Sequence, residues 1–196
     1  MKVKRSIVTV APVLEPIDRD SIGKLDLKLE AGTTEDALLN IWIQAAREKI
    51  EERTGLSLIT QTRVIKLDHF PRGCDGIELL YGPVQSVVVT YQDDDDATQT
   101  LSSSDYWLDT HGPGRITIKN SWPSTMDRPA AVTITYVAGF GLTAATVPGP
   151  LRSAVLMRFA HLYENRQSVV PGAMDTVPLG EDDLVFPYVM TQNASY

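Results

Sequence analysis

Two stretches of the chain carry apolar residues at helical spacing. The first runs from about Thr34 to Thr54, and Gly55 is placed to end it in the left-handed conformation that glycine adopts readily. One face of this helix is predicted to be apolar, and it consists of Leu38, Leu39, Trp42, Ile43, Ala45, Ala46 and Ile50. The opposite face is predicted to be polar and solvent-facing, and it consists of Asn40, Gln44, Arg47, Glu48 and Glu51.

The second long helix is predicted over residues 151–166, directly after Pro148-Gly149-Pro150. Its apolar arc consists of Leu151, Val155, Leu156, Phe159, Ala160, Leu162 and Tyr163. A short helix is predicted within Asp18–Leu29. The acidic run Glu181-Asp182-Asp183 suits the N-terminus of another helix, which Pro187 would limit.

The segment between the two long helices has the alternating pattern of half-buried antiparallel strands. Val132, Ile134 and Tyr136 are predicted to face one way, and Thr133 and Thr135 the other. The predicted strands are Leu58–Phe70, Ile77–Tyr81, Val84–Tyr91, Thr98–Leu101, Tyr106–Asp109, Arg115–Lys119 and residues 132–136.

This order of elements predicts an α+β fold, with a helical core and an inserted antiparallel β module. The helical core is predicted to comprise residues 17–56 and 147–168, and the β module residues 57–146. Residues 1–16 are predicted to form an extended N-terminal arm, because Pro12 and Pro16 bias their neighbours toward extended geometry. Residues 169–196 are predicted to be a C-terminal docking segment followed by a tail.

Composition narrows the classes of function. The 196 residues carry a formal net charge of −7, so the chain lacks the broad basic footprint of a nucleic-acid-binding protein. No apolar run reaches the roughly 18–20 residues that a membrane helix needs. Cys74 is the single cysteine, which excludes an internal disulfide and indicates a reducing compartment.

Motifs that mark common enzymes are missing from the sequence. There is no GxGxxG, P-loop, G-x-S-x-G or HExxH, so nothing points to a cofactor, a catalytic residue or a metal site. The three histidines, His69, His111 and His161, belong to different predicted elements and are unsuited to a shared metal. The chain is therefore predicted to be no enzyme and to work by binding other proteins.

Two acidic features leave alternatives open. Asp93, Asp94, Asp95 and Asp96 form a predicted hairpin tip, which is either a solvated turn or a weak calcium loop. Asp105 and Asp109 flank Tyr106 and Trp107, an arrangement that a sugar-binding or hydrolytic site also shows.

A series of short phrases lies between about residues 20 and 168. They are Glu35-Asp36-Ala37-Leu38-Leu39, Ala45-Ala46-Arg47, Glu51-Glu52-Arg53-Thr54-Gly55, Leu58-Ile59-Thr60-Gln61-Thr62, Asp68-His69-Phe70-Pro71, Gly82-Pro83-Val84-Gln85-Ser86-Val87, Ser104-Asp105-Tyr106, Pro113-Gly114-Arg115-Ile116, Trp122-Pro123, Thr135-Tyr136-Val137-Ala138-Gly139-Phe140-Gly141 and His161-Leu162-Tyr163-Glu164-Asn165-Arg166. In order and spacing they resemble the phage head–tail connector (adaptor) family, including its members in gene transfer agents.

The resemblance implies a structural subunit that joins a ring of about twelve copies beneath the portal of a tailed-phage-like particle. Such a ring meets a stopper or tail-completion protein on its other side and leaves a channel through which DNA passes. It implies a location in the particle's neck, after assembly in the bacterial cytoplasm. The helices would form the ring body, and the β module would project from it.

Site residues follow from the same resemblance. In related adaptors a C-terminal segment docks into the portal, and Leu184, Phe186 and Tyr188 are the candidates here. Asp93–Asp96 either lines the DNA channel or faces outward. The alternatives are another neck component, such as a stopper or tail-completion protein, and a soluble sugar-binding or hydrolytic β module.

Overall fold

A computed structural model describes residues 5–23, 35–73, 75–165 and 180–190. The described residues divide into two compact units. The β unit lies within Met1–Pro12, Gly55–Phe140 and Met190–Tyr196, and the helical unit within Val13–Thr54 and Gly141–Val189. The architecture is α+β, as the order of elements predicts.

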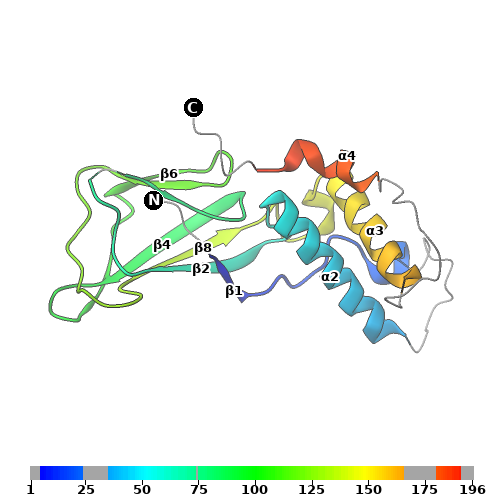
Figure 1. The fold of residues 1–196 in the computed structure, drawn as a ribbon, viewed down its shortest axis with the longest axis horizontal. Coiled ribbons are helices and arrows are strands. Elements are labelled where there is room, and N and C mark those ends of the chain that lie inside the picture. The colour runs from blue at the N-terminus through cyan, green and yellow to red at the C-terminus, as the bar shows by residue number, and fades with distance from the viewer. Residues whose placement is uncertain (1–4, 24–34, 74, 166–179, 191–196) are drawn as a thin grey trace, which may run out of the picture. The chain divides into compact units, whose positions relative to one another are not determined.

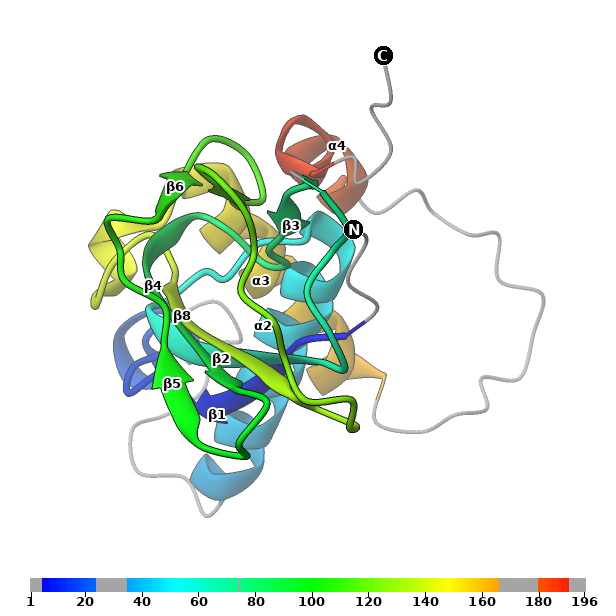
Figure 2. The ribbon, with the colours of Figure 1, turned by 90° about the vertical axis from the view of Figure 1, so that its left-hand side faces the viewer.

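The β unit holds two antiparallel sheets, whose strands are drawn in Figures 1 and 2. The five-stranded sheet has the order β1 (Ile7–Val10), β2 (Gln61–Leu67), β8 (Val132–Ala138), β4 (Val84–Gln92) and β5 (Thr98–Thr100). The three-stranded sheet has the order β3 (Ile77–Glu78), β7 (Arg115–Ile118) and β6 (Tyr106–Asp109). The predicted strands at Leu58–Phe70 and Ile77–Tyr81 are therefore shorter than their apolar runs.

Strand β8 is the centre of the larger sheet and shows why its sequence alternates. It pairs with β2 from Gln61↔Ala138 to Leu67↔Val132, and with β4 on its other side. Its burial alternates along the whole strand, and Val132, Ile134, Tyr136 and Ala138 are buried. The predicted orientation of Val132, Ile134 and Tyr136 is confirmed.

One apolar core joins the two sheets of the β unit. The larger sheet contributes Ile65, Val89 and Ile134, and the smaller sheet contributes Ile77 and Ile116, all fully buried. Because both sheets turn their apolar faces toward this core, each can leave its other face to solvent.

Glycine is required where the β unit turns. Gly55 has φ +70° and follows the long helix directly, so the predicted left-handed stop is confirmed. Gly139 has φ +141°, and a Cβ there would lie within 2.6 Å of backbone atoms of Ile59 and Thr60. Position 139 therefore excludes any larger side chain.

The helical unit is built on α2 (Asp36–Thr54) and α3 (Gly149–Glu164), followed by α4 (Glu181–Val185). Short helical turns are η1 (Arg19–Gly23), η2 (Ala144–Thr146) and η3 (Phe186–Tyr188). The predicted helix within Asp18–Leu29 is thus reduced to η1 in the described residues, and its remainder lies outside them. The predicted 169–179 stretch and the tail after residue 190 also lie outside the described residues.

Helices α2 and α3 pack through aliphatic side chains and one aromatic pair. Trp42 and Tyr163 meet edge to face, with their ring centroids 5.7 Å apart. The fully buried side chains are Leu39, Ile43, Ala46 and Ile50 on α2 and Leu151, Ala154, Val155 and Phe159 on α3. Figure 1 shows α2 in blue and cyan beside α3 in orange.

The prediction for the faces of α2 is partly wrong. Leu38 and Ala45, assigned to the apolar face, are exposed, whereas Arg47 and Glu51, assigned to the polar face, are buried. The physical reason is pairing: Arg47 and Glu51 stand four residues apart and form an ion pair of 3.1 Å. Burial of a charge is tolerated when an opposite charge accompanies it.

Candidate interaction surfaces

The acidic hairpin tip is a turn closed by its first aspartate. The carboxylate of Asp93 accepts hydrogen bonds from the backbone N–H groups of Asp95 and Ala97, at 3.1 and 2.9 Å. It also accepts one from the side chain of Gln99 at 2.8 Å, and this bond is the main cause that lowers the pKa of Asp93. The turn then brings the chain from β4 to β5, with Asp96 in the left-handed region at φ +60°.

The other three aspartates do not converge. Ser124 donates its hydroxyl to Asp94 at 2.8 Å, and Arg128 pairs with Asp96 at 2.8 Å, so both carboxylates are tied to the loop before β8. The carboxylate of Asp95 is exposed. Across the described part of the chain, no group of three or more His, Cys, Asp or Glu side chains could hold a metal ion. The hairpin tip is thus an interlocked turn at which Asp94, Asp95 and Asp96 are exposed.

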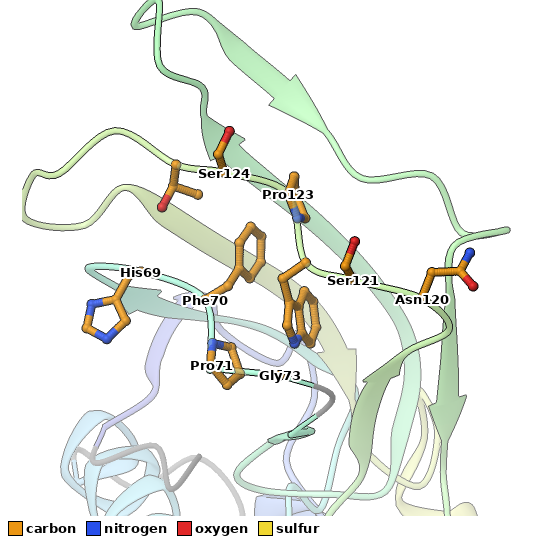
Figure 3. Close-up of a pocket in the computed structure, with 10 residues that line it drawn as sticks. His69, Phe70, Pro71, Gly73, Asn120, Ser121, Pro123 and Ser124 are labelled. Atoms are coloured by element: carbon orange, nitrogen blue, oxygen red, sulfur yellow. The ribbon is translucent and has the colours of Figure 1, made fainter.

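A pocket of about 440 Å³ lies beside this turn, between the loop that follows β2 and the loop that precedes β8. Figure 3 shows Phe70 and Pro71 on the first loop and Ser121, Pro123 and Ser124 on the second. The rings of Phe70 and Trp122 stack with centroids 4.7 Å apart, and the Trp122 indole N–H donates to the Asp75 carbonyl at 3.2 Å. An aromatic stack with a few hydroxyls suits contact with another protein rather than acid–base chemistry.

The residues proposed for a sugar site are held apart. Tyr106 is buried in the core of the β unit and donates its hydroxyl to the Val87 carbonyl, and burial raises its pKa. Asp105, directly before β6, and Asp109, at its end, are four residues apart, or about 13 Å by strand rise, beyond the separation that glycosidase carboxylates use. Asp109 instead accepts a hydrogen bond from the His111 N–H at 2.9 Å, which lowers its pKa. The described side chains therefore assemble no hydrolytic pair at β6.

The three histidines lie on three different elements. His69 lines the pocket, His111 follows β6 beside Asp109, and His161 is on α3, where its ring is within 3.2 Å of Asn165. Cys74 lies outside the described residues. His111, whose ring lies 3.1 Å from the Asp109 carboxylate, is almost fully exposed, so this pair stands on the surface rather than in a pocket.

The C-terminal segment combines buried anchoring residues with an exposed one. Val185 and Glu181 are fully buried, and Glu181 accepts a hydrogen bond from Arg158 at 2.7 Å. Arg53 pairs with Asp182 and thereby lowers the pKa of that carboxyl. Phe186 is 79% exposed. The structure therefore fastens α4 to its own unit and turns Phe186 outward.

The other two docking candidates are less exposed than Phe186. Leu184 and Tyr188 are half-buried, on either side of it. The exposed surface that this segment offers is thus centred on one aromatic ring.

A buried ionic cluster on α2 was missed by periodicity alone. Arg47 pairs with Glu15 at 2.8 Å as well as with Glu51, and only 4% of Arg47 is exposed. Burial raises the pKa of Glu15, and Arg47 opposes that rise. The i,i+4 spacing of Arg47 and Glu51 was a visible signal for part of this cluster, whereas Glu15 is remote in sequence.

The N-terminal strand is an exposed apolar segment. Strand β1 pairs with β2 from Ile7↔Val64 to Val10↔Thr62 and forms one edge of the larger sheet. Ile7, Val8 and Val10 are 50%, 39% and 57% exposed. Edge strands with exposed aliphatic side chains are common sites of pairing with other chains.

No helix among the described residues combines the length and the apolar character needed to cross a membrane.

No protein-family model matches the sequence. No curated protein matches it.

Several chains of solved structures share its fold along nearly the whole length. A chain from the neck of an empty GTA particle, computed with C6 symmetry, is 24% identical, with 98% of this chain and 99% of that chain covered and a TM-score of 0.80. A chain from the virion of a native gene transfer agent (GTA) particle is 23% identical, with 98% and 99% covered and a TM-score of 0.79. A chain from the neck of a native GTA particle, computed with C12 symmetry, is 22% identical, with 97% and 98% covered and a TM-score of 0.70. At these identities the likeness shows the fold.

Proposed function

We propose that this chain is a non-enzymatic structural subunit in the neck of a tailed-phage-like particle or gene transfer agent. In that neck it acts as the head–tail adaptor, which joins the portal to the stopper or tail. The observation that carries the proposal is the match over 98% of this chain and 99% of a chain from a GTA neck. Because the match includes both units, it reflects the whole arrangement of the chain rather than one common domain.

The surfaces of the described residues support a binding role over a catalytic one. The carboxylates of Asp93, Asp94 and Asp96 are engaged in holding a turn, and the histidines lie on separate elements. The features that remain are an aromatic pocket, an apolar edge strand and the outward Phe186. All three are surfaces of the kind that protein partners cover.

The subunit is proposed to act in a closed ring of about twelve copies. Chains with the same fold come from GTA necks computed with C12 and C6 symmetry, which supports cyclic assembly. A closed ring needs two different surfaces on each subunit, because each copy meets its two neighbours through opposite sides. DNA passes through the ring without sequence-specific binding, and the net charge of −7 suits a channel wall that does not hold DNA tightly.

Phe186, with Leu184 and Tyr188, is proposed to dock the portal. Aromatic side chains dominate many protein interfaces because they bury a large area with little loss of side-chain freedom. Val185 and Glu181 anchor the segment, so Phe186 is presented from a defined backbone. Phe186→Ala is expected to weaken portal binding at least tenfold in a pull-down or by interferometry. Trp107→Ala is the matched control, because Trp107 is also an exposed aromatic (59%) and lies on β6.

Electron microscopy tests the main proposal. The purified chain is mixed with the portal protein of its particle, or particles made in the bacterial cytoplasm are imaged directly. The expected result is a ring of this subunit between the portal and the tail. Particles whose neck lacks this subunit, together with a chain that fails to bind the portal, would refute the proposal.

A further inference from the structure

The larger sheet of the β unit ends in two different edges. Among the described residues, β1 pairs only with β2, and β5 pairs only with β4, so each is the last strand on its side. Strand β1 is aliphatic and exposed on both of its faces. Strand β5 is the polar sequence Thr98-Gln99-Thr100 and is exposed along its whole length.

The open side of β5 can be assigned residue by residue. The Leu101 N–H donates to the Val89 carbonyl of β4 at 2.9 Å, so Leu101 turns its backbone groups toward β4. Backbone groups alternate in direction along a strand, and Gln99 therefore also faces β4 through its pairing with Tyr91. Thr98 and Thr100 consequently direct their backbone N–H and carbonyl groups to the open side, where another strand could accept them.

The two edge strands run in the same direction. Each neighbouring pair from β1 through β2, β8 and β4 to β5 is antiparallel, so an even number of reversals separates β1 from β5. Two copies that keep the same orientation about a ring axis would therefore bring β1 of one copy beside β5 of the next in a parallel pair. Such a pair joins two different edges, as the heterologous contact of a closed ring requires.

Charge favours the same arrangement. Within one copy, Ile7 at the start of β1 pairs with Val64 in the middle of β2, and Thr98 at the start of β5 pairs with Gln92 at the end of β4. The start of β1 follows the exposed Arg5, with Lys2 and Lys4 before it in the sequence, and β5 begins just after the acidic turn. Because Arg5 and Asp96 each precede their strand by two residues, a parallel pair between copies that aligns Ile7 with Thr98 sets Arg5 beside the acidic turn, where Asp95 is exposed.

We infer that neighbouring copies of this chain join edge to edge, with β1 of one copy paired in parallel with β5 of the next. The Arg5 side chain of the first copy faces the Asp95 carboxylate of the second. The contact extends the five-stranded sheet from copy to copy, as in β-strand addition, and covers the exposed Ile7, Val8 and Val10. This inference rests on the proposed ring function and names the surface that closes the ring.

Cysteine pairs on the two edges test the contact directly. In a Cys74→Ser full-length chain, Ile7→Cys is combined with Thr98→Cys, because both positions lie on the same face of the sheet. Mild oxidation at high protein concentration is expected to give a ladder of multiples of 21.6 kDa on a non-reducing gel. The matched control is Ile7→Cys with Gln99→Cys, one residue along the same strand but on the opposite face, which is expected to give no ladder. Equal ladders, or none from either pair, would overturn the inference.

Further variants separate the edge contact from a folding defect. Thr100→Pro removes an N–H from the open side of β5 and is expected to abolish the ladder while the urea midpoint stays unchanged. Arg5→Glu and Asp95→Lys are each expected to reduce cross-linking several-fold, and the double variant is expected to restore it. If Asp95→Lys instead alters DNA passage with no change in cross-linking, the acidic turn serves the channel and the inference fails.

The inference and the proposed function fail in distinguishable ways. A ring of this subunit in the particle neck, without cross-linking between β1 and β5, would leave the function standing and place the contact elsewhere. A subunit absent from the neck would remove the function itself.

Discussion

The β unit and the helical unit are stabilised by different means. The β unit has a continuous apolar core between its two sheets, with Ile65, Ile116 and Ile134 fully buried; the buried charged side chain among its described residues is Arg63, which lies over the ring of Tyr81. The helical unit combines its aliphatic contacts with buried charges, among them Arg47 and Glu181. A hydrophobic pattern therefore describes the first unit well and the second unit incompletely.

This difference determines which substitutions destabilise each unit. An apolar core loses stability when volume is removed, because a cavity remains. A buried ionic cluster loses stability when one partner is removed, because the charge left behind has no compensation. Variants in the two units can be followed separately in backgrounds that keep a single tryptophan, Trp122 in the β unit or Trp42 in the helical unit, with the other two replaced by Phe.

The largest expected effect is on the β core. Ile134→Ala removes a fully buried side chain from the central strand and is expected to lower the free energy of unfolding by about 4 kcal/mol. Urea unfolding monitored by Trp122 fluorescence measures it. Val88→Ala, at a 51% exposed position on the neighbouring strand, is the control and is expected to change stability by less than about 1 kcal/mol. Equal losses from both variants would contradict the assignment of the core.

The next effect is on the ionic cluster of the helical unit. Arg47→Met leaves the carboxylates of Glu15 and Glu51 close together without their cation, at an expected cost of about 3 kcal/mol. The triple variant with Glu15→Gln and Glu51→Gln is expected to recover most of the loss, because no buried charge then remains unpaired. Unfolding followed by Trp42 fluorescence measures both. A triple variant as unstable as Arg47→Met would show that the charges are not the cause.

A smaller effect is expected from Tyr136 at high pH. Burial raises the pKa of Tyr136 to about 12 from its ordinary value of 10.0, so folding favours its protonated form. The stabilisation is complete below pH 10 and is lost as the pH rises toward 12, by roughly 2 kcal/mol over that window. Tyr136→Phe is expected to lack this loss and to cost about 1 kcal/mol at pH 7, because its hydrogen bonds to Leu80 and Ser6 disappear.

Comparing the stability of wild type and Tyr136→Phe at pH 9 and pH 11.5 isolates the contribution of Tyr136, because both proteins keep the other tyrosines, such as Tyr106. Parallel stability curves for wild type and Tyr136→Phe would count against a buried, pKa-shifted phenol.

The smallest expected effects are on the pH dependence of stability, and their direction differs between the two units. The pKa of Asp93 is lowered, so its contribution to the β unit is present above its ordinary pKa of 3.8 and is lost as the pH falls through the lowered value. The pKa of Glu15 is raised above 4.5, so its contribution to the helical unit is present below 4.5 and is lost as the pH rises through the raised value.

Urea midpoints between pH 3 and pH 6 test this contrast. Asp93→Asn is expected to reduce the fall in the urea midpoint at acid pH that Trp122 fluorescence reports. Glu15→Gln is expected to remove the fall in the urea midpoint with rising pH that Trp42 fluorescence reports. Slopes of the same sign in both units would contradict the assigned shifts.

Much of the fold could be predicted because local periodicity and burial agree. The α+β class, the two long helices, the Gly55 stop and the alternation of Val132, Ile134 and Tyr136 are confirmed. Strand ends were less predictable, because apolar residues such as Leu58 and Leu79 are buried without belonging to a strand.

Less of the candidate surfaces could be predicted. The four aspartates were visible as a hairpin tip, but the bonds to Ser124 and Arg128 depend on a loop about thirty residues away. The pocket beside that turn was not predicted, because its two loops meet only in the folded chain. The docking roles of Leu184, Phe186 and Tyr188 stay predictions, although the structure shows Phe186 exposed.

The sequence by itself determined the order of helices and strands from α2 onward, since the spacing of apolar residues is a local property that each element satisfies on its own, whereas strand β1 in the predicted arm is defined by its pairing with β2. Only the tertiary structure decided which charges are buried and which edges remain open. Arg47 is buried because Glu15, 32 residues away, supplies a partner. Strands β1 and β5 became the two edges because the pairing of β2, β8 and β4 placed them at opposite ends of one sheet.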